Sequence, residues 1–144
     1  MYSLAPMIGA NNTIMCLWPV YMRMTKETSS HSCIVRQALV RTLGMFCRVL
    51  GSEWTEARLW YIYTKLSKDS SWRVRQQCAR ILPIVSLFLS PQERDERVAP
   101  LIKRLLRDPN RYVFLVASDM LGIYLATFAK PRILTVHVNS KMEL

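Results

Sequence analysis

Glycine is scarce in this sequence, with 4 residues among 144. A β-sandwich or barrel needs many tight turns, and a phosphate-binding loop needs a cluster of glycines, so the scarcity argues against both. The alternation of apolar and polar residues that indicates strands is sustained nowhere in the chain. A hydrophobic share of 51% nevertheless excludes a disordered composition. The sequence therefore predicts a globular, helical protein.

Clusters that could hold a metal or catalyse a reaction are also missing. The chain has only 2 histidines, and its 4 cysteines form no C-x-x-C pair, whereas a zinc site needs closely spaced ligands. The acidic pair Asp95 and Glu96 lies between Arg94 and Arg97, which predicts a solvated, salt-bridged surface. We predict no enzymatic activity, no metal and no cofactor. The cysteines are expected to be reduced and buried as small hydrophobic residues.

Long uninterrupted apolar runs are absent as well. No charge precedes Arg23, but Pro6, Asn11 and Pro19 interrupt the apolar residues of this segment. Residues 81–92 are uncharged, yet 12 residues are too few to span a bilayer. We therefore expect a soluble protein of the cytoplasm or the nucleus, without a membrane partner.

The chain does contain an internal repeat with a period of 39 residues. Val35, Val74 and Val113 are separated by this interval. The same register relates Leu43 to Leu82 and Leu121, Leu66 to Leu105, Ile62 to Leu101, and Asp69 to Asp108. A period of 20–50 residues is typical of solenoids, in which each unit buries its apolar face against the next. The alternative is an ordinary helical bundle with accidental repetition.

Each unit has the pattern of two amphipathic helices. In the last unit, residues 98, 101, 102, 105 and 106 are apolar and lie on one helical face, and Pro109 ends that helix. We predict an all-α fold, an α-solenoid of about three HEAT-type helical hairpins. The array covers residues 1–131, with the end of a partial repeat followed by hairpins at about residues 12–51, 52–90 and 91–131. Residues 132–144 are predicted to be a divergent tail.

Several motifs resemble those of one protein family. They are residues 69–79 (DSSWRVRQQCA) and 105–113 (LLRDPNRYV), supported by residues 5–9 (APMIG), 121–122 (LG) and 128–131 (FAKP). Over residues 4–131 the chain resembles the HEAT-repeat regulatory and scaffold subunits of serine/threonine protein phosphatases of the phosphatase 4 and 2A type. The resemblance implies a non-catalytic subunit that binds a phosphatase catalytic subunit and directs its action on phosphoprotein substrates.

The resemblance also implies a ladder of ion pairs between repeats. In this family an Asp of the intra-repeat turn pairs with an Arg that opens the second helix. Asp69 and Arg75 keep that pattern, whereas Asp108 is followed by Phe114 and position 30 is Ser. The sequence therefore predicts one complete rung of three.

The turns within the repeats are implied to bind the catalytic subunit. The matching positions here are Lys68, Asp69, Trp72, Arg73, Asp108, Asn110, Arg111 and Tyr112. Trp and Arg often dominate interface energies. Alternatively, Trp72 covers the core of its own repeat and Arg111 pairs with Asp108.

The excess of 20 basic over 10 acidic residues gives a net charge of +10. One hypothesis is a basic stripe, formed by Arg73, Arg75, Arg80, Lys103, Arg104 and Arg107, that attracts an acidic partner. The alternative is that these residues are the solvated faces of amphipathic helices. A second function follows from the stripe, a basic α-solenoid adaptor for nucleic acid or an acidic protein cargo. Nucleic acid is not the expected partner, because no basic and aromatic platform with defined spacing is present.

Overall fold

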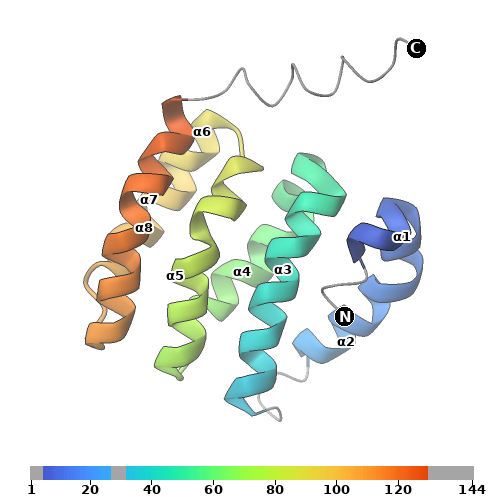
Figure 1. The fold of residues 1–144 in the computed structure, drawn as a ribbon, viewed down its shortest axis with the longest axis horizontal. Helices are drawn as coiled ribbons and strands as arrows, with labels where there is room; N and C mark the ends of the chain where they lie inside the picture. The colour runs from blue at the N-terminus through green and yellow to red at the C-terminus, as the bar shows by residue number, and fades with distance from the viewer. Residues whose placement is uncertain (1–4, 27–31, 130–144) are drawn as a thin grey trace.

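The computed structural model describes residues 5–26 and 32–129, and these ranges contain helices and no strand. The second helices of the hairpins, α3, α5 and α8, lie side by side as one layer, and α4 and α7 lie behind them (Figure 1). The prediction of an all-α solenoid of three hairpins is confirmed. The first hairpin is α2 (Trp18–Lys26) with α3 (Cys33–Trp54), the second α4 (Trp60–Leu66) with α5 (Trp72–Leu87), and the third α7 (Ala99–Leu105) with α8 (Arg111–Ala129), while α1 (Ala5–Asn12) precedes the array.

The second hairpin forms the centre of the hydrophobic core. The apolar residues on its inward face are buried, because α3 covers the hairpin on one side and α8 on the other. These buried residues are Leu59, Ile62, Tyr63, Leu66, Val74, Cys78, Ile81, Leu82 and Val85. In the third hairpin α8 is less covered, and Phe128 near its end is 39% exposed.

Two of the four cysteines depart from the predicted burial. Cys47 and Cys78 are buried, and burial raises the pKa of the Cys47 thiol to about 11. Cys16, however, is exposed and Cys33 is half-buried. The prediction of buried cysteines is therefore correct for Cys47 and Cys78, wrong for Cys16 and met only in part for Cys33.

A tyrosine joins the two helices in each of the first two hairpins. The hydroxyl of Tyr21 donates to the carbonyl of Leu39 over 3.0 Å. The hydroxyl of Tyr63 donates to the carbonyl of Cys78 over 2.7 Å. Both hydroxyls are buried, so each hydrogen bond satisfies a polar group that water cannot reach.

The corners between hairpins have a second repeated motif. Gly9 and Gly51 have φ angles of 77° and 78°, a conformation that favours glycine. The buried hydroxyls of Thr13 and Thr55 donate to the carbonyls of these glycines over 2.7 and 2.8 Å. A π-helical turn follows each corner, at Thr13–Leu17 and Thr55–Leu59. The bend at Gly51 lies inside α3 and redirects the chain into the second hairpin.

At the third corner, between the second and third hairpins, different residues redirect the chain. Ser90 caps the short helix α6 (Pro91–Glu93) by accepting from the Glu93 N–H, and Pro91 stands at its start. Arg94 then opens the π-helical turn Arg94–Val98. Its Nε donates to the carbonyls of Ser86 and Leu89 over 2.8 and 3.0 Å, and another guanidinium nitrogen donates to the carbonyl of Thr127. Arg94 is thus buried, which corrects its predicted place on a solvated surface.

The helix α8 combines a long apolar sequence with partial burial. By length and composition, residues Arg111–Phe128, with a mean hydropathy of 1.3, could cross a membrane. Val113, Ala117 and Tyr124 are buried in the hydrophobic core, and α8 packs on α5. A helix inside a solenoid has apolar residues on two sides, because it packs against a neighbour on each. The apolar composition of α8 is therefore also what a solenoid helix requires.

Candidate partner-binding ridge

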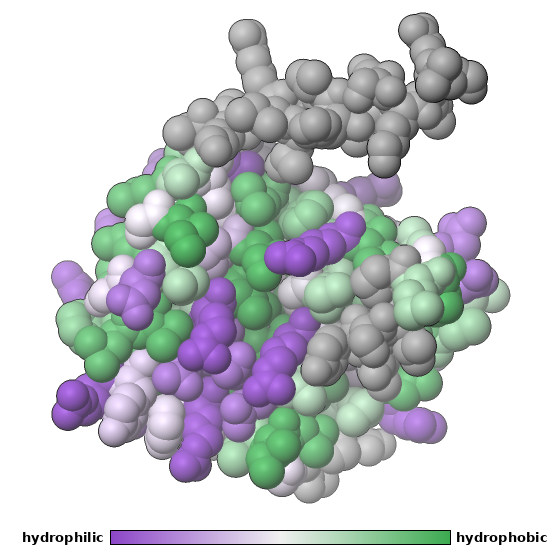
Figure 2. Space-filling model, in the orientation of Figure 1, coloured by the Kyte–Doolittle hydropathy of each residue, from purple (hydrophilic) through white to green (hydrophobic). Residues whose placement is uncertain are grey.

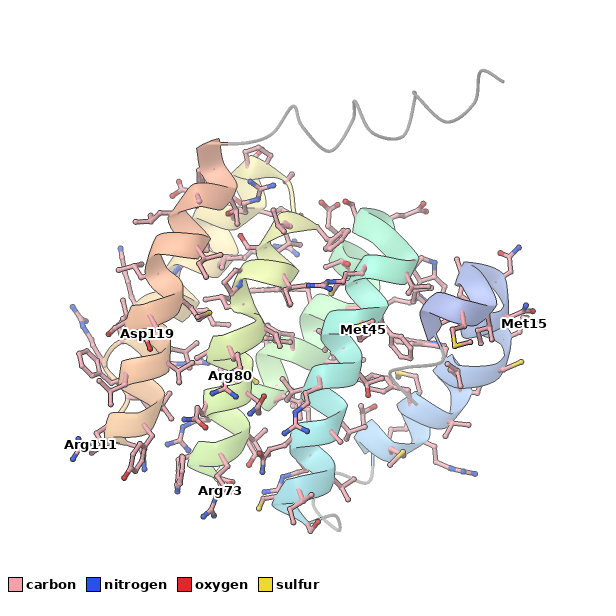
Figure 3. The ribbon with its side chains drawn as sticks, in the orientation of Figure 1. Met15, Met45, Arg73, Arg80, Arg111 and Asp119 are labelled. Carbon is pink, nitrogen blue, oxygen red and sulfur yellow. The ribbon has the colours of Figure 1, made fainter. Side chains whose placement is uncertain are left out.

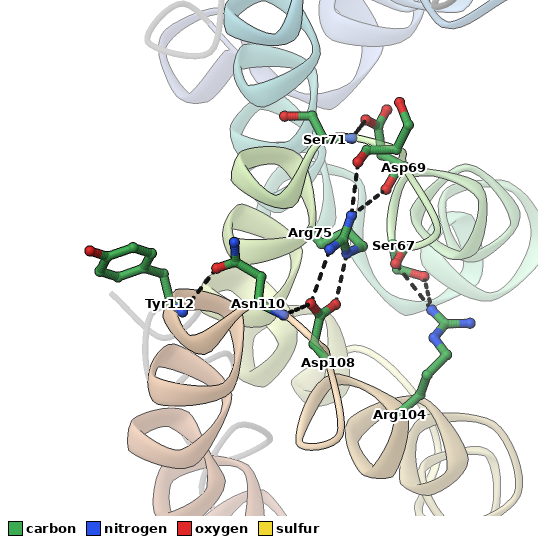
Figure 4. A network of polar contacts seen from close by, with 9 residues as sticks. Ser67, Asp69, Ser71, Arg75, Arg104, Asp108, Asn110 and Tyr112 are labelled. Atoms are coloured by element: carbon green, nitrogen blue, oxygen red, sulfur yellow. Dashed lines mark hydrogen bonds and ion pairs between the residues drawn. The ribbon is translucent and has the colours of Figure 1, made fainter.

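The turns of the second and third hairpins form a ridge, defined here as residues 67–73 and 106–112. Each turn is closed by its aspartate (Figure 4). Asp69 accepts the N–H of Ser71 over 2.8 Å, and Asp108 accepts the N–H of Asn110 over 2.9 Å. Asn110 in turn accepts the N–H of Tyr112 over 3.0 Å, at the start of α8. Asp and Asn favour such turns because their side chains reach the backbone two residues ahead.

Between the described hairpins the ladder of ion pairs has two rungs, and the predicted pairing within a repeat was wrong. Arg36 pairs with Asp69 and Arg75 with Asp108, with closest N–O distances of 2.8 and 2.7 Å. In both pairs two nitrogens of the guanidinium bind the two carboxylate oxygens. Each Arg therefore pairs with the Asp of the following repeat, 33 residues further on. The missing Arg at position 114 breaks no rung between the described hairpins.

Arg75 also joins the two turns of the ridge. Its Nη1 donates to the carbonyls of Asp69 and Ser70 over 2.9 and 3.1 Å (Figure 4). Burial alone would raise the pKa of Asp108, but the hydrogen bonds from Arg75 and from the Asn110 N–H outweigh it and lower the pKa. The hydrogen bond to Asp108 raises the pKa of Arg75. This rung is therefore ionised at neutral pH and holds the two turns in register.

Two predicted site residues, Asp69 and Asp108, therefore have their carboxylates bound by other groups of the array. The carboxylates of Asp69 and Asp108 are each held by an arginine and a backbone N–H. The side-chain exposed fractions are 11% for Asp69 and 7% for Asp108. They shape the ridge, whereas Lys68 and Arg111 are exposed on it.

Four side chains of the ridge, Trp72, Arg73, Arg111 and Tyr112, lie against one another and are called here the aromatic stack. The rings of Trp72 and Tyr112 are stacked, with centroids 5.3 Å apart and an angle of 28° between their planes. The guanidinium of Arg73 lies 4.8 Å from the Trp72 ring, and that of Arg111 lies 5.6 Å from the Tyr112 ring. Arg73 and Arg111 stand at the same end of the molecule, on α5 and α8 (Figure 3). The stack brings together four of the eight predicted residues.

The two alternatives for Trp72 and Arg111 have different outcomes. Trp72 is half-buried and packs against the core, and it also stacks on Tyr112 of the next repeat, so both roles meet in one side chain. Arg111 lies over Tyr112, while Asp108 is held by Arg75. The predicted pair of Arg111 with Asp108 is therefore not formed.

Three residues support the ridge that the sequence did not assign to it, although Arg104 was among the residues of the hypothesised basic stripe. Arg36 supplies the first rung, and Gln76 donates to the carbonyl of Tyr112 over 3.4 Å. Arg104 donates to the hydroxyl of Ser67 over 2.6 Å and thereby ties α7 to the turn of the second hairpin. The repeated V-R dipeptides at residues 35–36 and 74–75 were the available signal for the first rung, since they place Arg36 and Arg75 in equivalent positions.

A hollow of about 390 Å³ lies between the turns of the ridge, with Lys68, Arg104 and Arg107 among its lining residues. Among the described residues, no group of three or more His, Cys, Asp or Glu side chains could hold a metal ion.

An array of stacked hairpins with a shared ridge of turns defines a HEAT-type α-solenoid, a class that presents extended surfaces to other proteins. A family model described as PIK3R4-like, middle domain, matches residues 19–136, and the chain belongs to this family. It is also 30% identical, over 131 residues, to serine/threonine-protein phosphatase 4 regulatory subunit 1 of Homo sapiens and of Mus musculus. This alignment covers 91% of the chain and 14% of each relative. The predicted resemblance to phosphatase regulatory subunits is confirmed.

Proposed function

We propose that this chain is a non-catalytic part of a regulatory or scaffold subunit and that its ridge binds the catalytic subunit of a phosphatase 4 type enzyme. The partner would then act on phosphoprotein substrates selected by the whole assembly. The relatives are named as regulatory subunits of phosphatase 4, which supports the role at the level of the family. The chain spans 14% of their length, so the role of this segment within the assembly is part of the proposal.

The aromatic stack is the observation that supports the ridge as the binding surface. Tyr112 is 50% exposed, and Arg73 and Arg111 are exposed on either side of the two rings. Aromatic and arginine side chains held in fixed positions lose little entropy on binding and are frequent anchors of interfaces. Because Trp72 and Tyr112 belong to consecutive repeats, a partner that contacts both would bind the array only when the two hairpins are stacked.

The test is capture of a purified phosphatase 4 catalytic subunit by the immobilised 144-residue chain. Changing Trp72→Ala and Arg111→Ala together should lower the captured amount by at least about tenfold, because anchor residues contribute most of the binding energy. Trp72 also contacts the core, so a second variant, Arg73→Glu with Arg111→Glu, leaves both rings in place. Circular dichroism of each variant checks that the helices remain.

The matched control replaces an aromatic residue and a base on the other layer of the array. Tyr61 is 76% exposed on α4 and Lys103 is exposed on α7, so Tyr61→Ala with Lys103→Ala should capture as much as the unchanged chain. Capture that is undiminished in both ridge variants would refute the ridge as the binding surface. Binding of nucleic acid in place of the phosphatase, with a steep loss on adding salt, would instead support the adaptor function.

A further inference from the structure

A groove runs between α3 and α5 on the face of the layer that α4 and α7 do not cover. Its volume is about 450 Å³, and apolar side chains form much of its lining, including Met45, Ile81 and Ile84. Gly44 lies opposite Ile81, and a Cβ placed on Gly44 would be 3.6 Å from the Ile81 side chain. Gly44 and Ile81 thus form the floor of the groove along the line where the two helices meet.

Three arginines also line this groove. Arg41 and Arg48 lie on α3, and Arg80 lies on α5. Arg41 and Arg80 are 39 residues apart and so occupy the same place in consecutive repeats. Arg48 follows Arg41 by two helical turns, about 10 Å along the axis. In Figure 2, hydrophilic side chains cross this face with hydrophobic surface between them, and Figure 3 shows Met45 and Arg80 on the two helices.

The three guanidinium groups have no protein partner among the described residues. The ion pairs in the described part of the chain join Arg36 to Asp69, Arg75 to Asp108 and Arg97 to Glu93, and none of these residues lines the groove. The aspartate in register with Arg80 on the next helix is Asp119 of α8, labelled in Figure 3, and it too is absent from the lining. Positive charge is thus concentrated along one apolar groove.

Such a groove selects its ligand by two features at once. Carboxylates pair with guanidinium groups in a bidentate geometry that arginine favours over lysine. The apolar floor rewards a ligand that also buries a hydrocarbon side chain. Among the described residues, no aromatic side chain lines the groove, whereas single-stranded nucleic acids are usually held by stacking on aromatic rings. The combination favours a peptide over a nucleic acid.

We propose that this groove binds an acidic peptide segment of a partner protein that inserts one aliphatic side chain between α3 and α5. The carboxylates on either side of the inserted residue pair with Arg41 and Arg80 across the groove and with Arg48 along it. This surface is separate from the aromatic stack, and it gives the array a second binding site that does not depend on the proposed phosphatase contact.

Binding is measured by fluorescence anisotropy with the full chain and a labelled dodecapeptide of aspartate and glutamate that carries one central leucine. The change Arg41→Glu with Arg80→Glu should raise the dissociation constant at least about tenfold, because like charges then face the ligand. The matched control, Arg23→Glu with Lys103→Glu, makes the same change in net charge on the exposed surfaces of α2 and α7 and should alter the constant less than about twofold.

Two further measurements separate this site from general charge attraction. The peptide with serine in place of leucine should bind several-fold more weakly, because the floor loses its apolar contact. The Arg73→Glu and Arg111→Glu variant, which changes the ridge, should still bind the peptide. The proposal is overturned if the control variant loses as much affinity as the groove variant, if the leucine makes no difference, or if an oligothymidylate binds the groove more tightly than the peptide.

Discussion

The helices α5 and α8 occupy the same place in consecutive repeats. The face that each helix turns towards the following repeat is buried on α5, however, and exposed on α8. On α5, Ala79 and Ser86 are 1% and 0% exposed because α8 packs over them. In the 39-residue register their counterparts on α8 are Ser118 and Leu125, and Leu125 is 56% exposed. The less apolar of the two faces is therefore the buried one. Burial in this array depends on the neighbouring hairpin more than on the residue itself.

In a solenoid, the stability of each hairpin depends on how many neighbouring hairpins pack against it. The second hairpin gains from two interfaces, and the third gains from one among the described residues. In such arrays the free energy of unfolding is close to a sum over the repeats and their nearest-neighbour contacts. Equivalent substitutions in the two hairpins should therefore lower the free energy of unfolding by different amounts. The difference between these amounts measures what the second interface contributes.

The largest difference is expected for two leucines in equivalent positions. Leu82 on α5 is 1% exposed, whereas Leu121 on α8 is half-buried. Leu82→Ala should lower the free energy of unfolding by about 3 kcal/mol, because it leaves a cavity in a close-packed core. Leu121→Ala should cost only about 1 kcal/mol, since part of its surface is already in water. Urea unfolding followed by circular dichroism measures both, and equal costs would contradict the comparison.

The hairpins could be predicted from the sequence because their signals are local. Pro109 cannot continue a helix, and the apolar residues of each helix recur with the helical period. These features depend on residues within one hairpin, and the 39-residue repeat of Val35, Val74 and Val113 carries them from one hairpin to the next. The ends of α4 and α7 and the starts of α5 and α8 accordingly lie at the expected turns.

The contacts between hairpins could not be predicted as easily. Arg75 was paired with the aspartate six positions before it in the chain, but its partner is Asp108 of the next repeat. The choice between the two depends on how the hairpins stack, and a single sequence does not contain that geometry. Arg94 was misplaced for a similar reason, since its buried acceptor at Thr127 belongs to α8. The aromatic stack likewise joins Trp72 and Tyr112 from different repeats.

A smaller effect is expected at the second rung of the ladder. Asp108→Asn should lower the free energy of unfolding by about 1–2 kcal/mol at pH 7, because Arg75 loses a charged acceptor in a mostly buried pair. The pKa of Asp108 is lowered on folding, so its contribution is complete above the unfolded pKa of about 4 and is lost as the pH falls through the lower, folded value. The difference between the two chains should therefore shrink in acid.

The control for this rung is the more exposed pair of Arg97 and Glu93, in which the side chains are 45% and 19% exposed. Arg97→Gln should change the free energy of unfolding by less than about 0.5 kcal/mol, as is usual for surface pairs. A difference between Asp108→Asn and the unchanged chain that stays constant down to pH 3 would exclude the ion pair as its cause.

The smallest effect on stability is expected on the outer face of α8. Leu115 and Leu125 are 43% and 56% exposed, so changing both to Glu should alter the free energy of unfolding by about 0.5 kcal/mol or less. The same change should shift the chain from associated species towards monomer, because an exposed apolar face favours contact with other molecules. Analytical ultracentrifugation measures the shift. An unchanged chain that sediments as a monomer throughout would show that this face does not drive association.

The tyrosine hydrogen bonds have a consequence for how the repeats tolerate changes in length. Donor and acceptor are 18 residues apart in the first hairpin and 15 in the second, yet both bonds join the same levels of the two helices. The connection between the two helices therefore differs by three residues, while the same kind of hydrogen bond closes both hairpins. The first two hairpins thus accommodate connections of different length around one shared contact.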